Sequence, residues 1–405
     1  MLIVSLVTFA WASSLHAFYD LGIVLRGSGT FSGGIGAPAV EYEGESGQIV
    51  MYFESPVPTA EVPAGCANSY QIGRATSQDG VTWTIDEAPV WSADPTAGSP
   101  RACSVAQPAV LFDGTRWNLF YSASKVPNEG ETTNAPSGIG WAVSDDGITW
   151  SPQEEQAVPF AGSPLGLASA TALNGTLYLS WASDPDLWMM SRPLNGGAWT
   201  APERIVDHAA VGEWGGDWVL GPSLLCNEAA DNQLGMLVGG DSTSGVRSLA
   251  WGDSANAHAW TFKEPISEGT LDATTLNHWD TLRAGLGFVL WYSRTDPTSG
   301  LKAVGVALTD TRLGTIVPRV CPNPWANLDT GDTGDTGTID TGDTAVTVDT
   351  ADSGAGADTD TADTAFPCDC VDEQGCNCAT GGSGVAGFAA ALGPLASLAR
   401  RRDNA

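Results

Sequence analysis

The chain has 405 residues, enough for one large all-β domain or two ordinary domains. It is rich in Gly (49) and Trp (16) and poor in Lys and Arg (17 together), which is typical of short strands joined by tight turns. The formal net charge of −30 argues against nucleic acid as a partner, because Lys and Arg side chains hold a phosphate backbone.

Residues 1–17, "MLIVSLVTFAWASSLHA", form an apolar run that ends in the small residue Ala17. The run is too short to span a bilayer and lies where a secretory signal lies, so it predicts a signal peptide and an exported protein. It departs from the usual pattern, because no Lys or Arg precedes Arg26 and Leu15 is bulky. The alternative is a buried first strand.

The body of the chain, residues 18–325, contains internal repeats. The segments "IGRATSQDGVTW" (72–83) and "IGWAVSDDGITW" (139–150) share the pattern I-G-x-A-x-S-x-D-G-x-T-W. Before each copy lie two further alternating runs. The first of these begins at Pro38 in the first unit and at Pro108 in the second. Asp-Gly between two alternating runs is a strong hairpin signal, because Gly accepts a positive φ. Each copy therefore predicts the third and fourth strands of a four-stranded antiparallel unit.

Weaker echoes of this unit follow in residues 170–200, 221–262 and 281–308. Five four-stranded units predict an all-β fold, a five-bladed β-propeller, which we expect to be a monomer. The fifth unit has no clear outermost strand, and the early segment "YDLGIVLRG" (19–27) would fill that gap and close the ring. A β-sandwich is the main alternative, but it does not explain a four-strand period.

The motif and the blade plan resemble the five-bladed glycoside hydrolases of the arabinanase and β-xylosidase, invertase and levansucrase type. The resemblance implies hydrolysis by carboxylates at the mouth of the central channel, with an Asp opening each of the first two blades and a Glu opening the third. The matching positions here are Ala37, Gln107 and the region 169–171, none of which carries a carboxylate. The inherited mechanism is therefore expected to be absent.

Other residues could still form a site, because the loops after the second strands and before the first strands return to the same face. We predict three catalytic candidates on these loops: Asp217, Glu213 and Asp241. The predicted ligand-binding residues are Glu54, Asp184, Trp188, Trp218, Arg294 and Asp296, because sugar rings stack on flat aromatic faces and Arg donates to hydroxyls. For each acid the alternative is an ordinary turn residue.

Three functions follow from this reading: binding of a carbohydrate at the channel mouth, hydrolysis of a furanoside or related polysaccharide by the acids named above, and a protein-binding or structural surface role. We expect no cofactor, although a structural calcium ion stays open. His208, His258 and His278 are isolated in the sequence and show no metal-ligand spacing, so no metal site is predicted.

Eight cysteines fall into two sets. In an exported chain, Cys66, Cys103, Cys226 and Cys321 indicate two disulfides. Sequence does not fix their connectivity, and we expect Cys66 to pair with Cys103 and Cys226 with Cys321. The other four crowd into a C-x-C…C-x-C cluster after residue 367.

Composition changes sharply after Trp325. Residues 326–366 are dominated by Asp, Thr, Gly and Ala, which predicts a disordered linker. Residues 367–405 contain the Cys cluster, a short apolar stretch and an arginine run, an order that resembles the MYXO-CTERM class of bacterial C-terminal sorting tails. That resemblance implies Cys376 or Cys378 as the anchoring residue. A simple C-terminal membrane anchor is the alternative, and both place the body at the cell surface.

Overall fold

The computed structural model describes residues 17–43, 46–159, 165–227, 233–263, 265–266, 268–272, 276–284, 287–309 and 316–317. The chain divides into two units, Met1–Asp329 and Thr330–Ala405, and every described residue belongs to the first. The expected linker and sorting tail, with Cys376 and Cys378, lie outside the described residues, as do residues 1–16 of the expected signal peptide. Residue Ala17 is the first residue of a strand.

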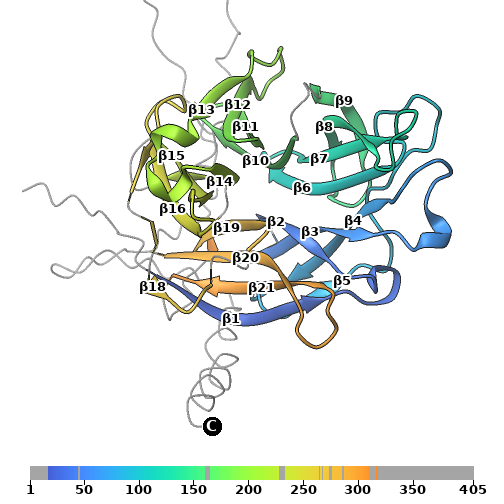
Figure 1. The fold of residues 1–405 in the computed structure, drawn as a ribbon, viewed down its shortest axis with the longest axis horizontal. Helices are drawn as coiled ribbons and strands as arrows, with labels where there is room; N and C mark the ends of the chain where they lie inside the picture. The colour runs from blue at the N-terminus through green and yellow to red at the C-terminus, as the bar shows by residue number, and fades with distance from the viewer. Residues whose placement is uncertain are drawn as a thin grey trace, which may run out of the picture. The chain divides into compact units, whose positions relative to one another are not determined.

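The first unit is the predicted five-bladed β-propeller (Figure 1). Four blades are antiparallel sheets of four consecutive strands, and the bounds of these strands follow. Blade 1 has β2 (Gly36–Glu43), β3 (Gln48–Pro56), β4 (Tyr70–Ser77) and β5 (Thr84–Ile85). Blade 2 has β6 (Ser104–Phe112), β7 (Trp117–Lys125), β8 (Ala135–Ser144) and β9 (Ser151–Pro159). Blade 3 has β10 (Leu165–Leu173), β11 (Thr176–Ser183), β12 (Asp186–Pro193) and β13 (Glu203–Val206). Blade 4 has β14 (Trp218–Asn227), β15 (Gln233–Asp241), β16 (Arg247–Ser254) and β17 (Thr261–Phe262).

Blade 5 closes the ring with the start of the chain. Its strands are β19 (Trp279–Ala284), β20 (Gly287–Thr295), β21 (Lys302–Leu308) and, on the outside, β1 (Ala17–Arg26). The predicted closing role of residues 19–27 is confirmed, because β1 pairs with β21 in antiparallel fashion. Two short strands extend this sheet: β18 (Glu268–Gly269) beside β1 and β22 (Ile316–Val317) beside β19.

The innermost strands β2, β6, β10, β14 and β19 surround the centre, and each contacts the next around the ring (Figure 1). The part of the chain that the structure describes contains four short 3₁₀ turns between strands: η1 (Gly29–Phe31), η2 (Thr59–Glu61), η3 (His208–Ala210) and η4 (Glu213–Gly215). Among the described residues, no helix is long and apolar enough to cross a membrane.

The two copies of the duplicated motif form the outer hairpins of blades 1 and 2. Asp146 Oδ1 accepts hydrogen bonds from the backbone N–H groups of Ile148 (2.8 Å) and Thr149 (2.7 Å). Asp79 holds its turn in the same way. The predicted structural role of these acids is confirmed, because both carboxylates bond their own turns.

The tryptophans that end the motif pack between neighbouring blades. The Trp150 ring lies 5.6 Å from that of Tyr52 in blade 1, and the Trp83 ring lies 6.3 Å from that of Trp291 in blade 5. Such aromatic contacts stabilise one blade against the next. The motif therefore serves to pack neighbouring blades of the propeller against each other.

The predicted disulfide between Cys66 and Cys103 is confirmed and ties the connections on either side of blade 1's outer strands. Cys226 lies in β14, but its expected partner Cys321 lies outside the described residues, so that pairing stays a prediction.

Candidate functional site

The candidate site is the mouth of the central channel, the end at which the innermost strands begin. Four of these strands share one backbone feature there: a residue with positive φ, at which the register with the second strand shifts. The residues are Ala37 (φ 46°), Gln107 (φ 50°), Leu167 (φ 54°) and Gly221 (φ 59°). A β-bulge of this kind re-aims a side chain at the end of a sheet. The bulges thus mark equivalent positions in four blades.

This equivalence corrects the sequence alignment of the third blade. The residue that corresponds to Ala37 and Gln107 is Leu167, not one in the region 169–171, because the register shift lies between Gly166 and Ser169. The four equivalent positions therefore carry Ala, Gln, Leu and Gly, and none of these side chains is a carboxylate.

Gln107 reaches across the mouth. Ser122 Oγ donates to its Oε1 (2.8 Å), and its Nε2 lies 3.1 Å from Nε2 of His278 at the start of blade 5. Blades 2 and 5 are not neighbours in the ring, so this contact bridges the channel. Since an amide nitrogen only donates, His278 Nε2 is the acceptor and the neutral ring carries its proton on Nδ1.

His278 is suited to this acceptor role. Burial lowers its pKa below the ordinary value of 6.5, because desolvation disfavours the imidazolium; the Glu54 carboxylate opposes this effect, and Lys302 and Arg247 add to it. Its Nδ1 is buried and has no hydrogen-bond partner among the described residues. The ring is therefore neutral near pH 7, with a buried Nδ1–H that has no partner among the described residues.

Glu54, a predicted ligand-binding residue, is a carboxylate of this mouth. It lies near the end of β3 opposite Gly36 and is 5% exposed. Its Oε1 lies 3.2 Å from Lys302 Nζ of blade 5, and its Oε2 accepts from the backbone N–H of Gln107 (3.2 Å). Glu54, Gln107, His278 and Lys302 thus join blades 1, 2 and 5 in one polar cluster, here called the mouth cluster.

Gln107 and His278 of the mouth cluster line a small cavity in the channel. Blades 1, 2, 3 and 5 line this cavity of about 20 Å³, which is room for roughly one water. The buried Asp280 accepts hydrogen bonds from the Val40 N–H (2.7 Å) and Ser223 Oγ (2.7 Å), and so links blades 1, 4 and 5. This cavity is too small for a sugar ring, so a ligand of this face would lie outside it.

The three predicted catalytic residues lie on blade 4 and its entry loop. Glu213 is exposed in η4. Asp217 is also exposed, and its backbone N–H donates to the carbonyl of Asp241 (3.0 Å). The Asp241 carboxylate is held by Arg247, with Nε and Nη2 at 2.7 and 2.8 Å from its two oxygens. Asp217 and Asp241 are thus brought side by side at the end of β15, while their catalytic role stays a prediction.

The remaining predicted ligand-binding residues lie around the same face in different settings. Asp184 is exposed in the β11–β12 turn, whereas Trp188 and Trp218 are half-buried and pack against the cores between blades. The Arg294 guanidinium bonds Asp20 of β1 (3.0 Å). Of the six predicted residues, Glu54 is the one in the mouth cluster, and the roles of the other five stay predictions.

Asp296 is fixed in the β20–β21 turn. Arg26 Nε donates to its Oδ2 (3.0 Å), and the Thr298 N–H donates to its Oδ1 (3.1 Å). The hydrogen bond from Arg26 and that from the Thr298 backbone lower the pKa of Asp296 to about 2. The Asp296 carboxylate thus stabilises its own turn and forms an ion pair with Arg26.

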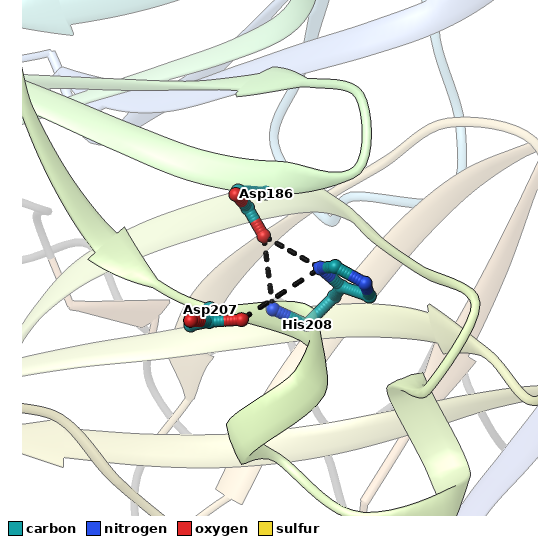
Figure 2. Close-up of side chains that lie close together, drawn as sticks. All are labelled: Asp186, Asp207 and His208. Carbon is teal, nitrogen blue, oxygen red and sulfur yellow. Dashed lines mark hydrogen bonds and ion pairs between the residues drawn. The ribbon is translucent and has the colours of Figure 1, made fainter.

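One cluster of ionisable groups was not foreseen from the sequence. Asp186, Asp207 and His208 bring ligand atoms within 4.8 Å of one another beside η3 (Figure 2). Asp186 Oδ1 accepts from the His208 backbone N–H (3.0 Å) and lies 2.8 Å from its Nδ1. Burial raises the pKa of Asp186, but these hydrogen bonds and one from Arg204 outweigh it, so the pKa lies below its ordinary value. The residues are 22 positions apart in the chain, which is why sequence spacing did not reveal them.

Two carboxylates and an imidazole are donor groups that suit a divalent transition metal. Arg204, however, lies 3.2 Å from Asp186 Oδ2 and 3.1 Å from Asp207 Oδ2. Its guanidinium already balances the negative charge of the two carboxylates, which would otherwise attract a metal ion. The arrangement is therefore best described as an Asp-oriented histidine within an ion-pair network.

Comparison with known proteins gives the fold. No family model matches the chain, and no curated protein matches it. Among solved structures, the catalytic domain of the GH62 α-L-arabinofuranosidase of Coprinopsis cinerea has a TM-score of 0.52 and 14% identity, over 72% of this chain and 96% of that one. The β-1,2-mannobiose phosphorylase of Listeria innocua gives 0.53 and 12% over 72% and 96%, and the α-L-arabinofuranosidase of Podospora anserina, solved with cellotriose, gives 0.50 and 14% over the same shares. The chain has the fold of these carbohydrate-active enzymes.

Proposed function

We propose that this protein is an exported, surface-tethered propeller that binds a carbohydrate at its channel mouth without hydrolysing it. The mouth cluster carries this proposal. It offers an amide, a carboxylate and an ammonium group, which are the donors and acceptors that sugar hydroxyls need. The similarity in fold to enzymes that act on sugars supports the same ligand class.

The residues at the four bulges support binding rather than hydrolysis. Glycoside hydrolysis requires one carboxylic acid for the leaving oxygen and one carboxylate on the other side of the bond. The bulge positions supply Ala37, Gln107, Leu167 and Gly221 instead. Glu54 is the carboxylate of the mouth cluster, and its Oε1 lies 3.2 Å from Lys302 Nζ.

A hydrolase remains the second candidate, on one observation. Glu54 is a buried carboxylate at the mouth, and Asp241 and Asp217 lie on the same face. If Glu54 were the nucleophile or base, a second acid within about 5–10 Å of it across the bound bond would complete the pair. Release of reducing sugar that is lost on Glu54→Gln would establish this candidate.

One feature supports export. A disulfide between Cys66 and Cys103 is typical of oxidising compartments outside the cytosol.

The binding test compares the wild type with Gln107→Leu. We expect leucine to fit this backbone position, since Leu167 has a similar φ in blade 3 (54° against 50° at Gln107). The variant removes the amide that bridges to His278, so we expect affinity for a bound oligosaccharide to fall at least tenfold, or about 1.4 kcal/mol. Gln153→Leu, on the exposed outer strand of blade 2, is the matched control and is expected to bind as the wild type does.

The measurement is isothermal titration calorimetry with xylotriose, cellotriose and β-1,2-mannobiose, combined with product analysis of each sugar after prolonged incubation. Binding that Gln107→Leu weakens, with intact sugars, supports the proposal. Equal affinities of the wild type and Gln107→Leu would show that the sugar does not bind at the mouth. Cleavage of a sugar would show that the protein is a hydrolase and contradict a function limited to binding.

A further inference from the structure

A second concave surface lies away from the channel. It is a cleft of about 920 Å³ between the outer edges of blades 3 and 4, bounded by β13, the loop 207–214, the β15–β16 loop and β17. At this edge of blade 4 the outer strand β17 has two residues, whereas the corresponding strand β9 of blade 2 has nine. The outer edge of blade 4 therefore leaves uncovered a surface that blade 2 covers with its own strand.

Aromatic rings form the floor of this cleft. Trp214 of η4 and Phe262 of β17 line it, with ring centres 5.7 Å apart. Each ring lies against a glycine of the sheet: a Cβ at Gly240 would be 2.5 Å from the Trp214 ring, and a Cβ at Gly252 would be 2.6 Å from the Phe262 ring. The glycines let the rings approach the sheet closely, with an angle of 60° between the ring planes, and both rings are half-buried with the cleft above them.

A third ring, that of Trp260, is fixed at the end of the cleft. Its Nε1 donates to the carbonyl of Ala257 (3.1 Å), and this bond holds the indole in place before any ligand arrives. A preformed aromatic platform binds without a large loss of side-chain freedom. Volume, shape and rigidity are those of a small-molecule site.

The polar groups of the rim favour a neutral ligand. Ser244 and Thr261 are exposed and offer hydroxyls. Two charged groups of the rim already have partners: Asp207 lies 3.1 Å from Arg204, and Lys263 lies 3.4 Å from Asp253. The exposed Glu213 also lines the cleft, and its carboxylate would repel an anionic ligand. A charged ligand would have to compete with these pairs, whereas a polyol exchanges hydrogen bonds with them and stacks its ring on the platform.

We propose that this cleft is a second carbohydrate-binding site, which takes a neutral oligosaccharide on the Trp214, Phe262 and Trp260 platform. It is independent of the mouth, because no residue lines both the cleft and the channel cavity. Two sites on one propeller let it hold a polysaccharide at two points, which raises the overall affinity above that of either site.

The test uses Ser244→Trp, which fills the cleft from an exposed position, in the background of Gln107→Leu, which weakens the mouth. Gln153→Trp is the matched control on blade 2. Titration calorimetry with cellotriose and xylotriose is expected to show binding in the Gln107→Leu protein that Ser244→Trp weakens at least tenfold and Gln153→Trp leaves unchanged. Absence of such binding, or binding that Ser244→Trp does not change, would overturn the proposal.

A second variant protects the test against misfolding. Thr261→Arg places a long cationic side chain in the cleft from the exposed face of β17. Both variants are checked by circular dichroism and thermal unfolding. Loss of binding in two folded variants supports the cleft, and retention of binding in either folded variant contradicts it.

Discussion

Alanine at Gly147, in the second copy of the motif, is expected to destabilise the propeller by about 2 kcal/mol. Gly147 has a φ of 68°, where an L-residue costs about 1–2 kcal/mol, while the lower entropy of the unfolded chain returns about 0.4–1 kcal/mol. The new Cβ would also lie 2.8 Å from the Tyr52 hydroxyl oxygen and 3.2 Å from the Trp117 ring. Relief of this overpacking costs at least another 1 kcal/mol or so.

Gly175→Ala separates the two contributions. Gly175 has nearly the same φ, 72°, but a Cβ there meets no atom within 4 Å. Only the backbone cost applies, so we expect a loss of about 1 kcal/mol. In blade 4 the motif position of Gly147 is occupied by Ala257 (φ 65°), which shows that the turn itself accepts alanine.

The assay is urea unfolding followed by tryptophan fluorescence, with both variants compared with the wild type at one pH and temperature. The free energy of unfolding should fall about twice as far for Gly147→Ala as for Gly175→Ala. Equal losses would show that the contact between blades 1 and 2 at Tyr52 does not constrain this turn, and the packing role given to the motif would be wrong.

Two further predictions concern stability. The Cys66→Ser, Cys103→Ser double variant should lose about 4 kcal/mol of unfolding free energy, because the disulfide closes a loop with a separation of 37 residues; an unchanged urea midpoint would contradict this. Between pH 7 and 5 the wild type should lose stability, because the unfolded chain protonates His278 near its ordinary pKa of 6.5 while the folded chain resists protonation. His278→Gln should flatten this slope in pH-dependent thermal unfolding, and an unaltered slope would show that His278 is not the group responsible. The carboxylates with lowered pKa, such as Asp296 at about 2, lose their contribution only at lower pH and do not affect that window.

The blade plan was readable from the sequence because its signals are local. An Asp that bonds the next backbone N–H groups, a Gly with positive φ and a Trp that packs on the next blade all lie within one hairpin. Even the weak copy in blade 4 keeps this chemistry, with Asn256 in place of Asp; its Oδ1 accepts from the N–H groups of His258 and Ala259. Local chemistry of this kind repeats whenever the blade does.

The site was less readable because it depends on register and on contacts between distant residues. The bulge in β10 places Leu167 at the mouth, and only the pairing with β11 reveals that shift. The contact between Gln107 and His278 spans 171 positions, and no spacing rule connects them. Glu54 was found because the end of a second strand always faces the mouth, so topology alone was sufficient there.

The sequence does not show which acids of this face are held by arginines. Asp241 and Asp296 are acids after second strands, as expected, but Arg247 and Arg26 respectively hold their carboxylates. Which acid meets an arginine depends on side chains from other strands. The ion pair of Glu54 with Lys302 and the contact of Gln107 with His278 depend in the same way on residues from three blades.

The most direct test of a carbohydrate-binding mouth is a crystal structure of the propeller with the trisaccharide that binds most tightly in calorimetry. We predict an intact sugar above the channel, with its hydroxyl groups hydrogen-bonded to Gln107, Glu54 or Lys302. Sugar density confined to other surfaces, or density for a cleaved sugar at the mouth, would contradict the account.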